Sequence, residues 1–364
     1  MRTVLRLLVA FILAAPSSFA AQSNEIAPGD NLVVEGIPKI PAALAESASR
    51  YTHFRYGYLA SWHPTKREML ISTDFGETPQ IHALKFPGGA RTQLTFYADY
   101  VSGGIYQPKK GGCFIFSKDT NGDEFNRLYR YDIATAEITL LTDGKSRNES
   151  PVWSNSGEWL MYGSTRRNGT DMDLYVINPL EPKSNRMLAQ LEGGFWIPYD
   201  WSPDDSKALI YQHISATENN LWIIDVKTGE KNLLTPQEGN KQTAYWLGQF
   251  SKDGKGVYVT TDPDSEFQRL AYIDFATKQY KVLTDRLQAD VDEFDLSSDG
   301  KTLAYVSNEE GIGRLHLLDL ETCGEKPAPK LPTGVVSGIK WHPNGRELGC
   351  AHLLRIAWTA WCRI

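Results

Sequence analysis

Apolar and polar residues alternate along most of this chain in a pattern that repeats every 44 to 49 residues. Each repeat opens on an aromatic or large apolar residue followed by a short polar turn, as in VWSNSGEW and DWSPDDSK. The seven opening residues, called anchors from here on, are Trp62, Tyr106, Trp153, Trp201, Phe250, Leu296 and Trp341. Self-similarity at a period in the forties indicates a series of equivalent structural units.

The fourth repeat illustrates the content of one unit. Its anchor segment 199–202 precedes the turn 203–206, the apolar runs 208–211 and 221–226, the turn 227–230, and a closing Leu-Leu-Thr. Short runs of β-branched and aromatic residues between such turns are typical of strands joined by hairpins. The pattern therefore predicts four short antiparallel strands in each repeat.

A small sheet with apolar residues on both faces must have both faces covered. Radial stacking covers them, with the anchors packed between neighbouring blades. Frequent Gly and Asp-Gly argue against a helical solenoid. We therefore expect an all-β fold, a seven-bladed-type β-propeller of four-stranded antiparallel blades over residues 51–349. Its seventh blade is expected to be incomplete, because the repeat breaks off at Gly349, and this would leave apolar faces of the first and sixth blades poorly covered.

Residues 1–20 have the features of a secretion signal. Arg2 and Arg6 precede a short apolar run, and Ser18-Phe19-Ala20 forms a small-x-small cleavage site. The apolar run is too short to span a bilayer. The sequence therefore predicts export to a periplasm or to the extracellular space, without a membrane anchor.

Two further segments stand outside the repeat. Residues 21–50 form an N-terminal arm whose stretch PAALAESASR predicts a short helix, and the arm is either a strap toward another domain or a lead-in. Residues 350–364 (CAHLLRIAWTAWCRI) contain no acidic residue and no turn signal. This aberrant tail is either an amphipathic helix or the product of a shifted reading frame.

Composition excludes some classes of partner. The chain of 364 residues has a formal net charge of −6, which becomes −8 (−6 minus 2) once Arg2 and Arg6 are removed with the signal. An acidic chain without a basic patch is a poor ligand for nucleic acid. The spacing of the four cysteines does not resemble a disulfide framework.

Catalytic motifs are missing from the sequence. It contains no Gly-x-Ser-x-Gly, no H-E-x-x-H and no paired C-x-x-C, so we assign no catalytic residue, no metal ligand and no cofactor. His63 and His342 occupy equivalent WHP positions, which identifies them as turn residues. The stretch 72–78 resembles the Asp-box of sialidase-type propellers, but it occurs once and lacks the closing Trp.

One loop in the second repeat has the spacing of a calcium site. Asp119, Asn121 and Asp123 match the first, third and fifth positions of an EF-hand loop. The sixth position is Glu124 instead of Gly, and the twelfth is Arg130 instead of Glu. These departures favour a charged hairpin loop.

The amino-acid sequence of the repeats resembles that of the TolB-like, WD-repeat-related propellers of exported bacterial proteins, as in WSPDDSKALIY, FSKDGKGVYVTTD and LSSDGKTLAYVS. The segments DNLVVEGIPKIPAALAE, RYTHFR, WHPTKREMLIST and PGGARTQLTF resemble the N-terminal part of secreted prolyl oligopeptidase-family serine peptidases. The resemblance covers about residues 31–349 and is most specific in the first hundred.

This resemblance implies a propeller that restricts which peptides reach a Ser–Asp–His triad in a following α/β-hydrolase domain. No position matches the family's catalytic motif, so the chain is expected to be inactive in peptide hydrolysis by itself. In dipeptidyl-peptidase relatives, the matching second-blade loop carries an arginine toward the active site. Arg127, with Asp123 and Glu124, is therefore our candidate for substrate gating, against the alternative of a solvated charged loop.

Three functions remain open from the sequence. The first is the gating propeller of an exported prolyl oligopeptidase-type peptidase, with a peptide substrate when it is joined to a hydrolase domain. The second is a stand-alone TolB-like periplasmic propeller that binds a protein partner. The third, a sialidase-like enzyme, would need a pair of placed carboxylates.

Overall fold

The computed structural model describes residues 24–29, 32–52, 56–76, 78–86, 88–235, 243–353 and 362–363. The chain divides into two compact units, Met1–Phe54 and Arg55–Ile364. The predicted signal peptide, residues 1–20, lies outside the described residues, as does most of the predicted tail. Within the described ranges, no helix has both the length and the hydropathy that crossing a membrane requires.

The first unit contains the helix that the Ala-rich stretch predicted. Helix α1 spans Ala42–Thr52 and follows Pro41, whose fixed φ suits the start of a helix. Before the helix the chain folds back on itself, so that the Ile26 N–H donates to the Ile40 carbonyl at 2.9 Å. The short helix of the arm is thereby confirmed.

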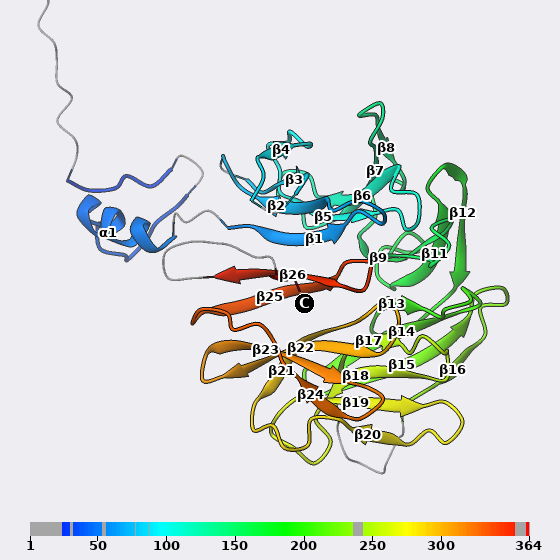
Figure 1. Ribbon diagram of the computed structural model, residues 1–364. Coiled ribbons are helices and arrows are strands. Elements are labelled where there is room, and N and C mark those ends of the chain that lie inside the picture. The colour runs from blue at the N-terminus through cyan, green and yellow to red at the C-terminus, as the bar shows by residue number, and fades with distance from the viewer. Residues whose placement is uncertain are drawn as a thin grey trace, which may run out of the picture. The chain divides into compact units, whose positions relative to one another are not determined.

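The second unit consists of small sheets in which consecutive strands pair in antiparallel order (Figure 1). The first blade contains β1 (Tyr58–Trp62), β2 (Met69–Thr73), β3 (Gln80–Leu84) and β4 (Arg91–Gln93). The second contains β5 (Val101–Tyr106), β6 (Cys113–Lys118), β7 (Arg127–Asp132) and β8 (Ile138–Leu140). The third contains β9 (Asn148–Trp153), β10 (Leu160–Ser164), β11 (Asp173–Asn178) and β12 (Glu181–Ala189). The fourth blade contains β13 (Phe195–Trp201), β14 (Lys207–Ser215), β15 (Glu218–Asp225) and β16 (Lys231–Leu233). The fifth contains β17 (Tyr245–Phe250), β18 (Gly256–Thr261), β19 (Arg269–Asp274) and β20 (Tyr280–Val282). The sixth contains β21 (Asp290–Leu296), β22 (Thr302–Glu309), β23 (Ile312–Asp319) and β24 (Gly324–Lys326). After them come β25 (Val335–Trp341), β26 (Glu347–Leu353) and the two-residue β27 (Cys362–Arg363).

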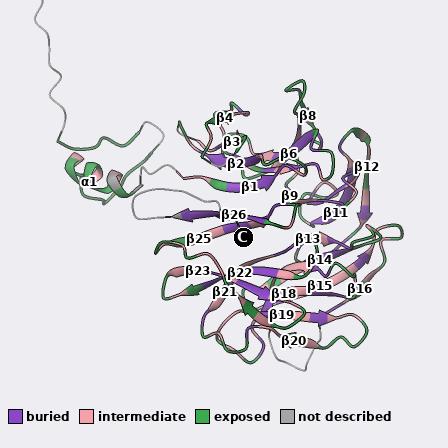
Figure 2. Cartoon of the chain, in the orientation of Figure 1, coloured by how far each residue is buried: buried purple, intermediate pink, exposed green. Residues whose placement is uncertain are grey.

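The fourth blade shows how the sequence pattern produces four strands. Residues Ala208, Leu209 and Ile210 of β14 are fully buried, so both faces of this strand are covered. Asp225 ends β15 and accepts the backbone N–H groups of the next turn, which closes the hairpin to β16. Figure 2 shows the same distribution elsewhere, with buried residues along the strands and exposed residues at the connections. The predicted four-stranded antiparallel blade is confirmed.

The tryptophan anchors bind each blade to the one before it. In every case the indole Nε1–H donates to the carbonyl of the residue immediately before the preceding anchor. The pairs are Trp62 to Lys340 (2.9 Å), Trp153 to Ile105 (3.2 Å), Trp201 to Val152 (3.0 Å) and Trp341 to Asp295 (3.1 Å). These indoles are buried, so the anchors lie between blades as the pattern predicted.

A second kind of hydrogen bond joins neighbouring blades at four positions. The side chain immediately before an anchor accepts the backbone N–H of the next anchor along the chain. The acceptors are Ser61 for Tyr106, Asp200 for Phe250, Gln249 for Leu296 and Asp295 for Trp341. Burial raises the pKa of Asp200 to about 6, and it raises the pKa of Asp295 as well. Polar groups are tolerated at these boundaries because each receives a hydrogen bond from the neighbouring blade.

The expectation of a seven-bladed propeller is wrong. The described residues form six four-stranded blades, and the seventh repeat contributes a partial sheet of β25, β26 and the short β27. Counting anchors overestimated the number of blades, because an anchor specifies the first strand of a unit and not the three that follow.

The expected exposure beside the partial sheet is also wrong at the inner strands. Strand β25 contacts both β1 and β21. Strand β26 runs past Gly349 to Leu353, and Gly349 packs directly against Leu59 and Trp62 of the first blade. On the other side, Leu348 and Cys350 share a core with the sixth blade. Strands β25 and β26 are thus enough to fill the space between blades six and one near the axis.

Strand direction divides the second unit into two ends. The first strand of each blade begins where the β2–β3 and β6–β7 connections lie, and we call this end the loop face. The opposite end, the turn face, carries the turns that follow the anchors and the turns between third and fourth strands. Because β26 is antiparallel to β25, β1 begins and β26 ends at the same loop face.

Candidate functional site

The connection between β6 and β7, residues 119–126, projects from the loop face of the second blade. Its tip has a tightly turned backbone, with positive φ at Asn121 (55°), Gly122 (72°) and Glu124 (59°). Asn and Gly adopt this left-handed conformation at low cost, whereas Glu does so only where surrounding contacts hold it. The loop is therefore a specified structure and not an extended linker.

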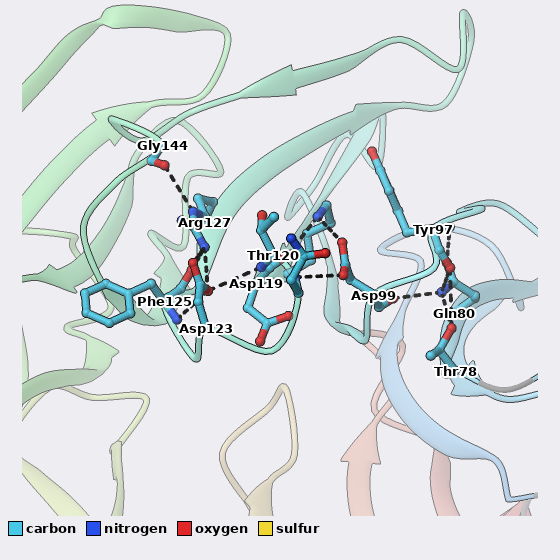
Figure 3. A network of polar contacts seen from close by, with 12 residues as sticks. Thr78, Gln80, Tyr97, Asp99, Asp119, Thr120, Asp123, Phe125, Arg127 and Gly144 are labelled. Carbon is cyan, nitrogen blue, oxygen red and sulfur yellow. Dashed lines mark hydrogen bonds and ion pairs between the residues drawn. The ribbon is translucent and has the colours of Figure 1, made fainter. Parts of the chain in front are cut away.

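Arg127 holds this loop together from inside (Figure 3). Its Nη1 lies 2.7 Å from the Asp123 carboxylate and donates to the Phe125 carbonyl at 2.5 Å. Its Nε donates to the Gly144 carbonyl at 3.1 Å, which connects the loop to the segment that leads into the third blade. The guanidinium also lowers the pKa of Asp123. With its side chain only 12% exposed, Arg127 braces the loop and does not point out of it.

The other side of the loop is attached, through Asp99, to the connection between the first and second blades. Lys118 Nζ lies 2.9 Å from the Asp99 carboxylate, and the Asn121 N–H donates to the same carboxylate at 3.0 Å. These contacts lower the pKa of Asp99. Buried Gln80 in turn donates to the Tyr97 and Asp99 carbonyls, at 2.9 and 3.2 Å, which fixes the backbone that carries Asp99 (Figure 3).

Two residues at the tip face outward. Within the described part of the chain, no cation lies within ion-pair distance of the Glu124 carboxylate, and the Phe125 side chain is 40% exposed. Of the three candidates from the sequence, the structure thus brings Asp123 and Arg127 together as a brace and leaves Glu124 available to a ligand. Phe125 was missed, although an apolar residue in a polar loop is a detectable signal. Asp99 and Lys118 were missed because their pairing depends on the register of β5 against β6, which brings Val101 opposite Lys118.

The carboxylates of this loop are directed toward its own backbone. Asp119 accepts the Glu124 N–H at 3.2 Å, and Asp123 accepts the Thr120 and Phe125 N–H groups at 3.3 and 3.0 Å. A calcium site requires six to eight oxygens that converge on one point. Among the described residues, no group of three acidic, histidine or cysteine side chains is arranged to hold a metal ion.

The two WHP histidines have the role that their position predicted. His63 Nδ1 accepts the backbone N–H groups of Thr65 and Lys66 at 3.2 Å, and His342 Nδ1 accepts that of Asn344 at 3.0 Å. Both histidines therefore close the turn after an anchor.

One serine–histidine contact occurs in the sixth blade. Ser307 Oγ lies 2.9 Å from His316 Nε2, and the Glu325 carboxylate lies 3.9 Å from His316 Nδ1. Ser307 is fully buried within β22, so a substrate has no access to its hydroxyl. Nucleophilic catalysis needs an accessible hydroxyl beside its base, and this arrangement does not meet that requirement.

Exposed aromatic side chains gather on the loop face of the first two blades. They come from the start of β1 and from the connections after β2, β4 and β6. The residues are Tyr58, Phe75, Phe96, Tyr100 and Phe125, which are between 40% and 76% exposed. Exposed apolar clusters of this kind mark surfaces that bind another protein or domain.

Comparison with known proteins supports the fold. No protein-family model matches the chain. The chain is 25% identical over 188 residues to the uncharacterized peptidase YuxL of Bacillus subtilis strain 168, which covers 50% of this chain and 25% of YuxL. It is 24% identical over 151 residues to the uncharacterized protein Atu1656 of Agrobacterium fabrum strain C58, covering 42% of this chain and 48% of that protein. The matches therefore span less than half the length of either relative.

Solved structures agree on a propeller. A prolyl endopeptidase studied for inter-domain dynamics in catalysis and specificity matches with a TM-score of 0.68 at 14% identity, over 89% of this chain and 52% of its own. TolB from Acinetobacter baumannii matches with a TM-score of 0.51 at 18% identity, over 74% and 62%. An oligogalacturonate lyase in complex with manganese matches with a TM-score of 0.65 at 12% identity, over 85% and 89%. At these identities the likeness establishes the fold: a β-propeller similar to the propeller domain of prolyl endopeptidase and to TolB.

Proposed function

We propose that this chain is the substrate-gating propeller of an exported serine peptidase of the prolyl oligopeptidase type. The observation that carries the proposal is the composition of the loop face. Strand β1 begins there and β26 ends there, and the braced second-blade loop and the exposed aromatic cluster lie on the same face. A domain joined before β1 or directly after β26 would meet that face first, whereas β27, the last described strand, runs back toward the turn face.

The similarity to peptidases supports this assignment. One relative is a peptidase by name, and the prolyl endopeptidase matches this chain over about half of its own length. In the proposed arrangement, the remaining half of such an enzyme supplies the catalytic domain. The serine that lies beside a histidine is buried and no position matches the family's catalytic motif, so we expect no peptide hydrolysis by this chain alone.

Gating would act at the tip of the second-blade loop. Arg127 and Asp99 hold the loop at fixed positions on both sides, so Glu124 and Phe125 are presented without the entropy cost of ordering a flexible segment on binding. The Glu124 carboxylate attracts cationic groups of a peptide, and the Phe125 ring offers an apolar contact. A large substrate would meet both groups, whereas a very small one would pass them.

A chimera tests this proposal. Residues 56–353 would replace the structurally matched part of the prolyl endopeptidase, and kcat/KM would be measured for a dipeptide-sized chromogenic substrate and for a series of longer peptides. We expect Glu124→Ala and Phe125→Ala to change the ratio of long to short substrates. Glu137→Ala is the matched control, because Glu137 is exposed on the turn face of the same blade.

Either of two results would remove the proposal. An intact, folded chimera without activity on the short substrate would argue against a match between this propeller and such a catalytic domain. An active chimera whose length preference is the same in all three variants would reject gating by this loop. Export is tested separately, by N-terminal sequencing of the secreted protein, which should begin at Ala21.

A stand-alone, TolB-like binding propeller is the second candidate. The partial sheet packs between the first and sixth blades, which favours a second unit that folds without another chain. This alternative requires a defined protein partner that binds in stoichiometric amount to the isolated chain.

A further inference from the structure

A groove of about 830 Å³ lies between the fifth and sixth blades, away from the second-blade loop. One wall is the segment that follows β20, with Leu283 and Leu287, and the other is formed by β22, β23 and β24. Its volume lies within the range of about 300–1,000 Å³ that is typical of small-molecule sites.

The wall from the sixth blade carries a fixed pair of aromatic rings. Tyr305 and His316 are cross-strand partners whose ring centroids lie 4.6 Å apart, with planes only 7° from parallel. The Tyr305 hydroxyl donates to Glu325 at 2.5 Å, and His316 Nε2 contacts Ser307 Oγ. Both rings are therefore held in place before any ligand arrives.

The same cross-strand position holds aromatic pairs in other blades. Phe116 and Tyr129 stack at 5.2 Å in the second blade, and Tyr162 and Tyr175 stack at 5.8 Å in the third. In the sixth blade a histidine replaces the second ring. This replacement brings a polar, partly exposed edge into a position that serves packing elsewhere.

Cationic side chains surround the opening of the groove. Lys281 and Arg286 are exposed, and neither has a carboxylate within 4.0 Å in the described ranges. Lys326, by contrast, is paired with Asp319 at 2.9 Å. Lys281 and Arg286 therefore bring two positive charges to the opening of the groove.

We propose that this groove binds a small planar aromatic carboxylate. The aromatic ring packs against His316 and the two leucines, which are half-buried, with Tyr305 supporting His316 from below, and the carboxylate pairs with Arg286 and Lys281. Glu325, an exposed residue of β24, repels a carboxylate on its side of the groove and can accept a hydrogen bond from a hydroxyl substituent. The ligand is thereby oriented with its negative charge toward the opening.

The thiol of Cys323 can report whether a ligand occupies the groove. Cys323 is an exposed thiol that lines the groove, with Sγ 3.6 Å from Lys281 Nζ, whereas Cys113 and Cys350 are buried. Iodoacetamide alkylates a thiol when the thiolate displaces iodide, so a ligand seated in the groove should slow this reaction at Cys323. Mass spectrometry of the peptide that contains Cys323 measures the rate at this residue alone.

The full chain would be titrated with 4-hydroxybenzoate, 4-hydroxybenzyl alcohol and cyclohexanecarboxylate, which separate the contribution of charge from that of planarity. We expect 4-hydroxybenzoate to bind, as measured by calorimetry, and to protect Cys323, and the other two to bind at least about tenfold more weakly. Equal binding of all three compounds, or no binding of 4-hydroxybenzoate, would overturn the proposal.

Matched variants locate the site. Arg286→Gln and Lys281→Gln should each weaken 4-hydroxybenzoate binding by about tenfold, as expected for loss of a charged hydrogen bond. Lys255→Gln, an exposed lysine of the same fifth blade outside the groove, should bind as the unmodified chain does. Circular dichroism confirms that each variant is folded, and unchanged affinity in a folded Arg286→Gln variant would also reject the site.

Discussion

The hydrogen bond from the Trp62 indole to the Lys340 carbonyl connects the first blade to the partial sheet, and Trp62→Phe removes it. Phenylalanine keeps most of the apolar contact with Leu59 and Gly349 but has no N–H group. The 2.9 Å bond lies in a site where Trp62 is 6% exposed, and the Lys340 carbonyl keeps its place opposite Gly349 in the β25–β26 ladder when the indole is lost. We therefore expect a loss of about 1 kcal/mol in the free energy of unfolding, the net contribution of one hydrogen bond.

The assay is equilibrium unfolding in urea, followed by far-UV circular dichroism so that the lost fluorophore does not matter. Trp201→Phe serves as the internal reference, since its indole makes the equivalent bond between complete blades, at 3.0 Å to Val152. Trp159→Phe is the negative control, because Trp159 is half-buried and its indole N–H has no partner in the described structure. If Trp62→Phe behaves like Trp159→Phe while Trp201→Phe is destabilised, the partial sheet does not seal the first blade and our account of ring closure is wrong.

Two further predictions concern the buried aspartate and the loop brace. Burial raises the folded-state pKa of Asp200 from 3.8 to about 6, so its contribution to stability is present at low pH and is lost as the pH rises through about 6. Between pH 5 and pH 7 the melting temperature should fall more for the native chain than for Asp200→Asn, which still accepts the Phe250 N–H; equal slopes would contradict this. Arg127→Ala should speed hydrogen–deuterium exchange at residues 119–126 by about tenfold, because three hydrogen bonds that hold the loop are lost. Glu124→Ala should leave this exchange rate unchanged, and an unchanged rate in Arg127→Ala would show that the loop does not depend on its brace.

The local elements of this fold were predictable from sequence because their causes are local. The apolar runs and Asp-containing turns of the fourth repeat specify strands and hairpins with neighbours in the chain, and β13 to β16 form where the pattern placed them. The number of blades was not predictable in this way. An anchor such as Trp341 indicates only the first strand of its blade. Whether the blade has all four strands depends on the residues that follow.

The sequence predicted where the candidate site lies, but it did not predict how the residues of that site act. The second-blade loop was recognisable by its charges, but the role of Arg127 depends on the Gly144 and Phe125 carbonyls, which have no sequence signature. Asp99 and Lys118 are 19 residues apart and meet because Val101, two residues after Asp99, pairs with Lys118 in the β5–β6 ladder. Such contacts come from tertiary structure, and a single sequence does not encode them in a readable pattern.

The hydrogen bonds at the blade boundaries also bear on how such a chain changes in evolution. An indole bond crosses four boundaries and a bond from an anchor N–H to a side chain crosses four, and both kinds meet at Trp341. A backbone carbonyl precedes every anchor, so a repeat with a Trp anchor would find an acceptor beside any preceding repeat after its neighbour is duplicated or deleted. The side-chain bond would persist only where the preceding repeat has Ser, Asp or Gln before its anchor.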